Sequence, residues 1–272
     1  MSRRWSVLSL AVPVLLIAGC NSASVGPSAD TLLADTPSPA TSASPASPEL
    51  SSSPPPAAAS SKPVSVSASI EPANFTSTVD NPWFPLMPGT RFTYRGTKDG
   101  KSAVETFTVA RGTKVIDAVT CVVVEDKVSL GGVATEKLIG YYAQDRDGNV
   151  WYFGEDMQEL DANGHVVNTD GSWHAGVDKA RPAFFMEATP TVGHSYAHAY
   201  TNNDFAVLSL SEKVTVPFGS FPDALVTKEW SPLEPDVETH KFYVRGVGVV
   251  RDVAVKGPTE ELLLVKVEAA AP

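Results

Sequence analysis

Apolar and polar residues alternate along the chain from residue 69 onward, and β-branched and aromatic residues supply many of the apolar positions. A period of two is typical of a strand that buries one face. Gly, Asp and Pro interrupt these runs at the spacing expected of antiparallel sheets. The pattern predicts strands over 91–96, 103–112, 115–128, 135–145, 149–155, 194–201, 206–216, 223–231, 239–255 and 260–269.

Very little of this region has helical periodicity. The best candidate is a short helix within 176–188, where Pro182 limits its length. Asp147, Gly148 and Asn149 stand between two predicted strands and favour the positive φ of a tight hairpin turn. We therefore predict a mainly β fold: a single antiparallel, strongly curved sheet, barrel-like or folded over as a sandwich, with at most one or two short helices.

The first 19 residues have the pattern of a signal peptide. Arg3 and Arg4 precede an apolar run over 7–18, which ends at small residues followed by Cys20. This run is shorter than the about 20 residues of a membrane-spanning helix. The segment LIAGC resembles the lipobox of bacterial lipoproteins, which implies cleavage before Cys20 and lipidation of its thiol. Acyl chains such as palmitate would then anchor the protein stably, whereas an ordinary secretory signal would leave Cys20 unmodified.

Residues 20–68 are dominated by Ser, Pro and Ala and contain almost no aromatic or large aliphatic residue. Such a segment cannot bury enough apolar surface to offset its ordering entropy. It is predicted to be a disordered tether with a reach of roughly 40 Å, and O-glycosylated stalks have a similar composition. Residues 69–272 are then long enough for a single β-rich globular domain with its own core.

The charge balance argues against two classes of partner. The first 68 residues hold three basic and three acidic side chains, so the formal net charge of −10 belongs entirely to the domain. Nucleic acids require clustered Lys and Arg to neutralise phosphates, and anionic lipids attract the same residues. We therefore expect no nucleic-acid binding, and contact with the membrane only through the lipid anchor at Cys20. The expected oligomeric state is a monomer.

The second cysteine, Cys121, stands among valines in a predicted strand and has no disulfide partner once Cys20 is lipidated. It is expected to pack as a small apolar side chain. A nucleophilic thiolate would need an electropositive neighbourhood, and the nearby acids do not supply one.

Two arrangements resemble metal sites only in part. The segment DRDGNVWYFGED begins like a calcium loop, with Asp145, Asp147 and Asn149 at alternate positions, but its glycine stands at the fourth place instead of the sixth. A hairpin turn is therefore favoured. His194 and His198 could share an ion on a helix, whereas on a strand they would be roughly 13 Å apart. We expect neither a metal nor another cofactor.

The chain contains no G-x-S-x-G, S-x-x-K or H-E-x-x-H motif and no phosphate-binding glycine loop, so no catalytic residue is predicted. A dispersed Ser–His–Asp site stays open, because such triads are recognised by geometry. The candidate ligand-binding residues are aromatic residues near predicted turns and strand ends: Trp83, Phe84, Trp151, Tyr152 and Trp173. Such rings either line the mouth of a pocket or plug the ends of the curved sheet.

Five segments, NPWFPLMPGT, DRDGNVWYFGED, GSWHAGVDKARP, PTVGHSYAHAY and HKFYVRGVGVVRD, occur in this order across residues 80–253. Together they resemble a family of uncharacterised exported bacterial proteins and lipoproteins. The resemblance implies one exported domain, and it brings no assigned activity with it. We therefore predict a lipoprotein on the extracytoplasmic face of the cell membrane that binds or carries a small or amphiphilic ligand without catalysis. An extracytoplasmic hydrolase with a dispersed site is the alternative.

Overall fold

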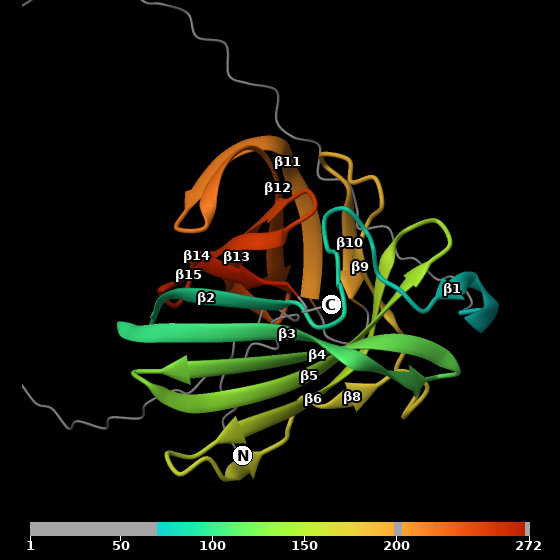
Figure 1. The fold of residues 1–272 in the computed structure, drawn as a ribbon, viewed down its shortest axis with the longest axis horizontal. Helices are drawn as coiled ribbons and strands as arrows, with labels where there is room; N and C mark the ends of the chain where they lie inside the picture. The colour runs from blue at the N-terminus through green and yellow to red at the C-terminus, as the bar shows by residue number, and fades with distance from the viewer. Residues whose placement is uncertain (1–69, 199–202, 270–272) are drawn as a thin grey trace, which may run out of the picture.

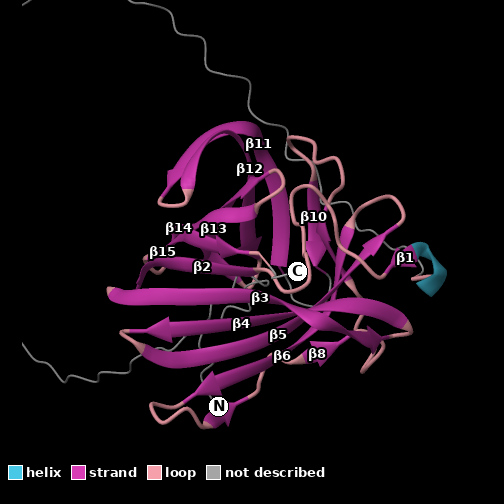
Figure 2. Cartoon of the chain, in the orientation of Figure 1, coloured by secondary structure: helices cyan, strands magenta, loops and turns pink. Residues whose placement is uncertain are grey.

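The computed structural model describes residues 70–198 and 203–269. The predicted signal peptide, the predicted lipidation site Cys20 and the predicted tether lie outside these residues. Within them the chain forms a three-residue 3-10 helix, η1 (Pro72–Asn74), and is otherwise built of strands and short connections (Figure 2). The strands are β1 (Phe75–Thr76), β2 (Arg91–Lys98), β3 (Lys101–Ile116), β4 (Val119–Leu130), β5 (Val133–Asp145), β6 (Val150–Leu160), β7 (Val166–Asn168), β8 (Trp173–His174), β9 (Ala183–Met186), β10 (Ser195–His198), β11 (Asn203–Val216), β12 (Gly219–Ser231), β13 (Glu234–Val244), β14 (Gly248–Lys256) and β15 (Glu260–Glu268).

Neighbouring strands are antiparallel throughout the described sheet, in the order β10-β11-β12-β13-β14-β15-β2-β3-β4-β5-β6-β7. Because β15 pairs with β2, the two halves of the domain form one sheet. Figure 1 shows β2 to β6 as a fan of long strands, with β11 and β12 standing across it. The short strands β1, β8 and β9 pair with β5 or β6. The predicted single, curved antiparallel sheet is confirmed, and in the described residues it does not close on itself.

Local irregularities in the strands allow this curvature. The β11–β12 pair shifts register between Val207 and Ser209 and again before Val214, and such bulges bend a strand and increase its twist. At the β2–β15 pair, a Cβ on Gly96 would lie 1.7 Å from the backbone oxygen of Glu261. Gly96 therefore permits a close approach of two strands that no other residue would allow.

The predicted short helix within 176–188 is wrong. Asp178 and Lys179 both have positive φ, which forms a turn and prevents a helix from starting there. The chain then enters β9, where Met186 pairs with Val150 of β6. Phe185 is buried in the core, so pairing with β6 and burial prevail over a weak local preference for helix. Within the described ranges, no helix is long and apolar enough to cross a membrane.

The predicted hairpin between 135–145 and 149–155 is confirmed as β5 and β6. Asp145 N donates to Asn149 O at 2.9 Å, and Gly148 has a φ of 88°. The predicted continuous strand over 239–255 is instead divided into β13 and β14. Gly246, with a φ of 76°, makes the turn and donates its N–H to Pro82 O at 2.7 Å. Alternation alone did not indicate this break, because β-branched residues continue on both sides of it.

The sheet buries apolar side chains on both faces of β4 to β6. Successive residues of a strand therefore point to opposite faces: Tyr142 belongs to the main core on the inner face, and Tyr141 belongs to a smaller cluster on the outer face. The outer cluster includes Cys121, which is fully buried, and Phe75 of β1 packs against it. The N-terminal end of the domain thus covers part of the outer face.

Candidate functional site

The predicted aromatic residues do not all meet in one place. Trp83, Phe84, Tyr152 and Trp173 are buried in the main core. Trp151 belongs to the outer cluster, because it precedes Tyr152 on β6 and therefore points to the opposite face. All four pack within this core, and the rings of Tyr152 and Trp173 are 5.6 Å apart. Of the five, the structure places Trp151 beside a sizeable cleft.

This cleft, which we call the Trp151 cleft, has a volume of about 370 Å³ and lies where η1 and β1 meet the β5–β6 turn. A space of this size falls within the usual range for small-molecule sites. Its lining combines apolar and charged side chains: Ile70, Glu71, Asn74, Phe75, Asp145, Arg146, Asp147 and Trp151.

The wall of the cleft is held by contacts that fix Trp151. Its Nε1 donates to Asp145 Oδ2 at 2.8 Å. The Phe75 ring lies edge-on to it with the centroids 6.3 Å apart, and the Phe184 ring packs on it at 5.1 Å. Trp151 is only 6% exposed. The cleft therefore has a rigid aromatic wall, since the ring would have to break a hydrogen bond and two ring contacts to move.

The opposite side of the cleft is formed by η1 and β1, which are attached to β5 through the backbone. Phe75 pairs with Asp145. Arg146 N donates to Asn74 O at 2.8 Å, and Arg146 Nε donates to Ala73 O at 3.0 Å. The Arg146 side chain is thereby tied to the cleft wall.

The partial resemblance of this turn to a calcium loop has a structural explanation. Asp145 Oδ1 accepts hydrogen bonds from Asp147 N at 3.0 Å and Asn149 N at 2.8 Å. Its Oδ2 accepts from Asn149 Nδ2 and from Trp151 Nε1. The carboxylate thus stabilises the turn, as Asp commonly does. No group of His, Cys, Asp and Glu side chains suited to a metal ion occurs among the described residues.

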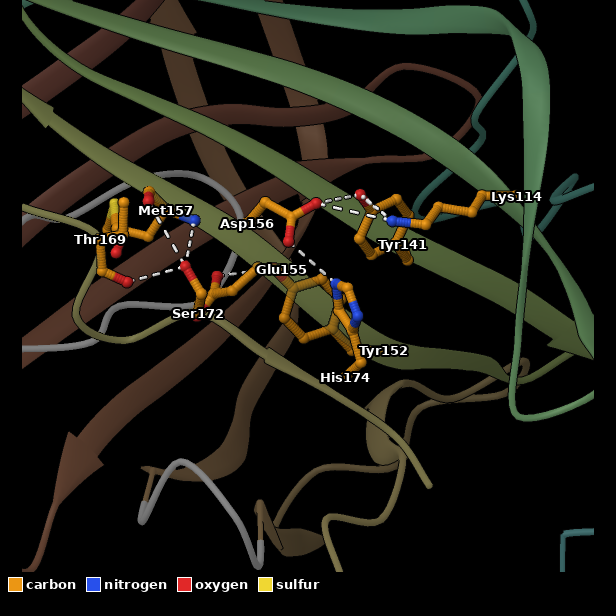
Figure 3. A network of polar contacts seen from close by, with 9 residues as sticks. All are labelled: Lys114, Tyr141, Tyr152, Glu155, Asp156, Met157, Thr169, Ser172 and His174. Carbon is orange, nitrogen blue, oxygen red and sulfur yellow. Dashed lines mark hydrogen bonds and ion pairs between the residues drawn. The ribbon is translucent and has the colours of Figure 1, made fainter. Parts of the chain in front are cut away.

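A second polar site lies on the outer face, where four strands each contribute one side chain to what we call the Asp156 network (Figure 3). Asp156 Oδ1 lies 3.0 Å from His174 Nε2, and Oδ2 accepts a hydrogen bond from the Tyr141 hydroxyl and lies 3.7 Å from Lys114 Nζ. Lys114 Nζ also donates to the Tyr141 hydroxyl at 3.0 Å. The side chains of Lys114 and Asp156 are 43% and 38% exposed, so solvent reaches the network.

The contacts in this network shift the pKa values of its members. Burial alone would raise the pKa of Asp156, but the hydrogen bond from the Tyr141 hydroxyl and the electrostatic effects of His174 and Lys114 outweigh it and lower the pKa. Its hydrogen bond to Tyr141 raises the pKa of Lys114. Burial, reinforced by the hydrogen bond to Asp156, raises the pKa of Tyr141. Asp156 is thus held as the carboxylate and Lys114 as the ammonium ion.

The interior of the sheet contains an excess of acidic side chains. Seven buried acids accompany two buried lysines among the described residues: Glu105, Asp126, Glu136, Glu155, Glu229, Asp252 and Glu260, with Lys98 and Lys241. Lys241 Nζ lies 2.9 Å from Glu229 Oε2, and Lys98 Nζ lies 3.3 Å from Glu260 Oε2. Two lysines cannot neutralise seven carboxylates, and an ionised carboxylate is costly to bury.

Burial shifts the titration of these acids upward. It raises the pKa of Glu155 to about 8 even though the Tyr152 hydroxyl donates to Oε2 at 2.7 Å. It also raises the pKa of Asp252 to about 8 against the opposing effect of Lys241. The pKa of Glu136 is raised well above its usual value, again chiefly by burial. At neutral pH the interior therefore retains protons that the same residues would release in water.

The remaining predicted positions have ordinary surroundings. Cys121 is buried and its Sγ contacts Val119 O, and burial raises the pKa of its thiol to about 12. This agrees with the predicted role as an apolar packing residue. His194 is exposed, with its Nδ1 3.2 Å from Glu187 Oε1. His198 lies in β10, in agreement with the strand interpretation, and residues 199–201 of the predicted strand lie outside the described residues.

Sequence reasoning did not find the Asp156 network or the cleft. The members of the network stand on β3, β5, β6 and β8, and no short motif contains them. The interior acids did have a signal: Glu105 and Glu136 occupy alternating positions otherwise taken by buried residues of the same strands. This alternation places Glu105 and Glu136 on the same face as their apolar neighbours, but it does not by itself say which face of the sheet is buried.

No protein-family model matches the chain, and no curated protein matches it. Two solved structures resemble it. A Bacteroides fragilis protein assigned as exported, with a YmcC-like fold, is 16% identical, and the match covers 69% of this chain and 99% of that one with a TM-score of 0.39. A Parabacteroides distasonis protein assigned as a lipoprotein is 15% identical with the same coverage and TM-score. A likeness of this size assigns neither activity nor ligand to this chain.

Proposed function

We propose that this protein is a lipoprotein, anchored through Cys20 to the extracytoplasmic face of the cell membrane, whose domain binds a small amphiphilic ligand in the Trp151 cleft without catalysis. The signal peptide and lipobox pattern support the location. The tether would separate the domain from the lipid surface. The binding role rests on the cleft itself.

The lining of the cleft suits a ligand with one apolar and one polar part. Ile70, Phe75 and Trp151 offer apolar contact, and the neighbouring carboxylates and Arg146 offer polar contact. Apolar surface that the ligand buries here contributes roughly 25 cal/mol per Å² before association costs. Because Trp151 is already immobile, little side-chain entropy is lost on binding.

The test is a titration of the mature chain, residues 20–272 with Cys20→Ser, with a neutral amphiphilic dye such as Nile red. Asn74→Trp places an indole in the cleft, and its backbone contacts to Arg146 do not depend on the side chain. Asn163→Trp makes the same change at an exposed turn elsewhere. We expect saturable binding to the wild type and the control, and binding at least tenfold weaker to Asn74→Trp. Absence of saturable binding, or equal binding by all three proteins, would overturn the proposal.

A hydrolase with a dispersed site is the second candidate, and the Asp156 network is the observation that favours it. Asp156 and His174 form an acid–histidine pair that solvent can reach. Within the described residues, however, the side-chain contacts of His174 are to Asp156 and to the Tyr141 ring, and neither supplies a Ser, Thr or Cys nucleophile. Ser172 Oγ donates instead to Thr169 O at 2.8 Å. Turnover of ester or glycoside substrates that His174→Ala abolishes would establish the hydrolase and refute the non-catalytic role.

A further inference from the structure

The side chains around the Trp151 cleft indicate which chemical class of ligand it takes. Three carboxylates line it, from Glu71, Asp145 and Asp147, against the single guanidinium of Arg146. Two aromatic rings, those of Phe75 and Trp151, line it as well. Resting on the proposed function, we infer that the ligand is an organic cation, an alkylammonium compound whose charged group lies between these rings and carboxylates.

The two rings form an edge-to-face corner in the lining of the cleft. Their centroids are 6.3 Å apart and their planes are at 79°. A cation is attracted to an aromatic ring when it lies over an open face of the ring, within about 6 Å of the centroid. Phe75 is half-buried and Trp151 is 6% exposed, so an ammonium group in the cleft meets the open part of the Phe75 ring and only the margin of Trp151. Alkylated ammonium fits the corner better than a metal ion, because its methyl groups also make apolar contact.

The charges at the cleft favour a cation over an anion. Asp145 is engaged in the hydrogen bonds of the turn, yet its carboxylate still contributes negative charge at the wall. Glu71 and Asp147 are exposed at the rim. Arg146 is the one cation of the lining, and its Nε is committed to Ala73 O. The whole chain, these residues included, has a formal net charge of −10, which attracts cations over a longer range.

The experiment separates charge from shape. Choline and its neutral isostere 3,3-dimethylbutan-1-ol have the same branched head, with nitrogen in one and carbon in the other. Each is added to the mature chain saturated with Nile red, and displacement of the dye is measured. We expect choline to displace the dye at a concentration at least tenfold lower than the isostere, and added salt to reduce this difference.

Neutral variants test the carboxylates. In the double variant Glu71→Gln, Asp147→Asn, the advantage of choline over the isostere should fall about threefold to tenfold, the size expected of exposed charge pairs. The matched control Glu212→Gln, Asp223→Asn removes the same charge from exposed positions on β11 and β12. It should leave the advantage nearly unchanged.

The outcomes distinguish this inference from the function on which it rests. If the wild type binds the dye, Asn74→Trp does not, and both compounds displace it equally, the binding function stands and the cationic ligand is refuted. A choline advantage that both double variants reduce equally would likewise refute recognition by Glu71 and Asp147. If no dye binds, the proposed function fails first.

Discussion

Lowering the pH from 7 to 6 should stabilise the domain, because its interior acids take up protons on folding. Glu155 and Asp252 have pKa values of about 8 in the folded protein, whereas unfolded Glu and Asp titrate near pH 4. Between these values the folded state holds more protons than the unfolded state. The free energy of unfolding therefore rises as the pH falls, and this contribution is lost as the pH rises through about 8.

Each such carboxyl contributes a slope of about 1.4 kcal/mol per pH unit, so Glu155 and Asp252 together give about 3 kcal/mol per unit. Burial raises the pKa of Glu136 and of Glu229 as well, so whatever they contribute to the pH dependence has the same sign. The lowered pKa of Asp156 has the opposite sign, but its effect lies below about pH 4, outside this window.

The assay is urea unfolding of the mature chain at pH 5, 6, 7 and 8, followed by tryptophan fluorescence, with the free energy extrapolated to zero urea. Glu155→Gln and Asp252→Asn should each reduce the slope by about 1.4 kcal/mol per pH unit. In Glu155→Gln, the amide oxygen can still accept the hydrogen bond from the Tyr152 hydroxyl. Exposed Glu212→Gln should leave the slope unchanged. A stability that is flat, or that increases from pH 6 to pH 8, would refute the argument that these acids are protonated in the fold.

Three further predictions concern the anchor and the packing. Wild-type protein should fractionate with membranes and resist salt washing, whereas the Cys20→Ser variant should remain an unprocessed precursor. A cleaved, soluble Cys20→Ser product whose first residue is the same as that of the mature wild type would refute lipidation. Trp83→Ala and Trp173→Ala should each lower the free energy of unfolding by about 3–5 kcal/mol, as for buried rings; a change in dye binding without loss of stability would contradict their role in the core. Gly154→Ala should lower the free energy of unfolding by about 2 kcal/mol or more, because Gly154 has a φ of 135° and the new Cβ would lie 2.2 Å from Trp173 O. Thermal unfolding of this variant at or above the wild-type temperature would contradict the prediction.

Much of the architecture could be predicted from local pattern. The alternation of apolar residues indicated the strands, and the DRDGN segment indicated the β5–β6 hairpin, because a turn depends on a few consecutive residues. The packing role of Cys121 followed in the same way from its valine neighbours. Position 246 shows the limit: the strand was expected to continue there, yet Gly246 has a φ of 76° in a turn closed by Val247 N donating to Val244 O. Its own N–H donates to Pro82 O, which is distant in the sequence.

Contacts between distant segments decided the rest. A local preference suggested a helix near residues 183–186, but pairing with β6 made them a strand, since a strand is stabilised by partners that local propensity does not contain. Trp151 and Tyr152 were predicted to act together, and alternation on β6 places them on opposite faces. The Trp151 cleft brings residues 70–75 beside residues 145–151, and the Asp156 network unites four strands. Such sites arise from strand register and sheet curvature, which depend on the sum of all long-range pairings and therefore cannot be read from any one stretch of the chain.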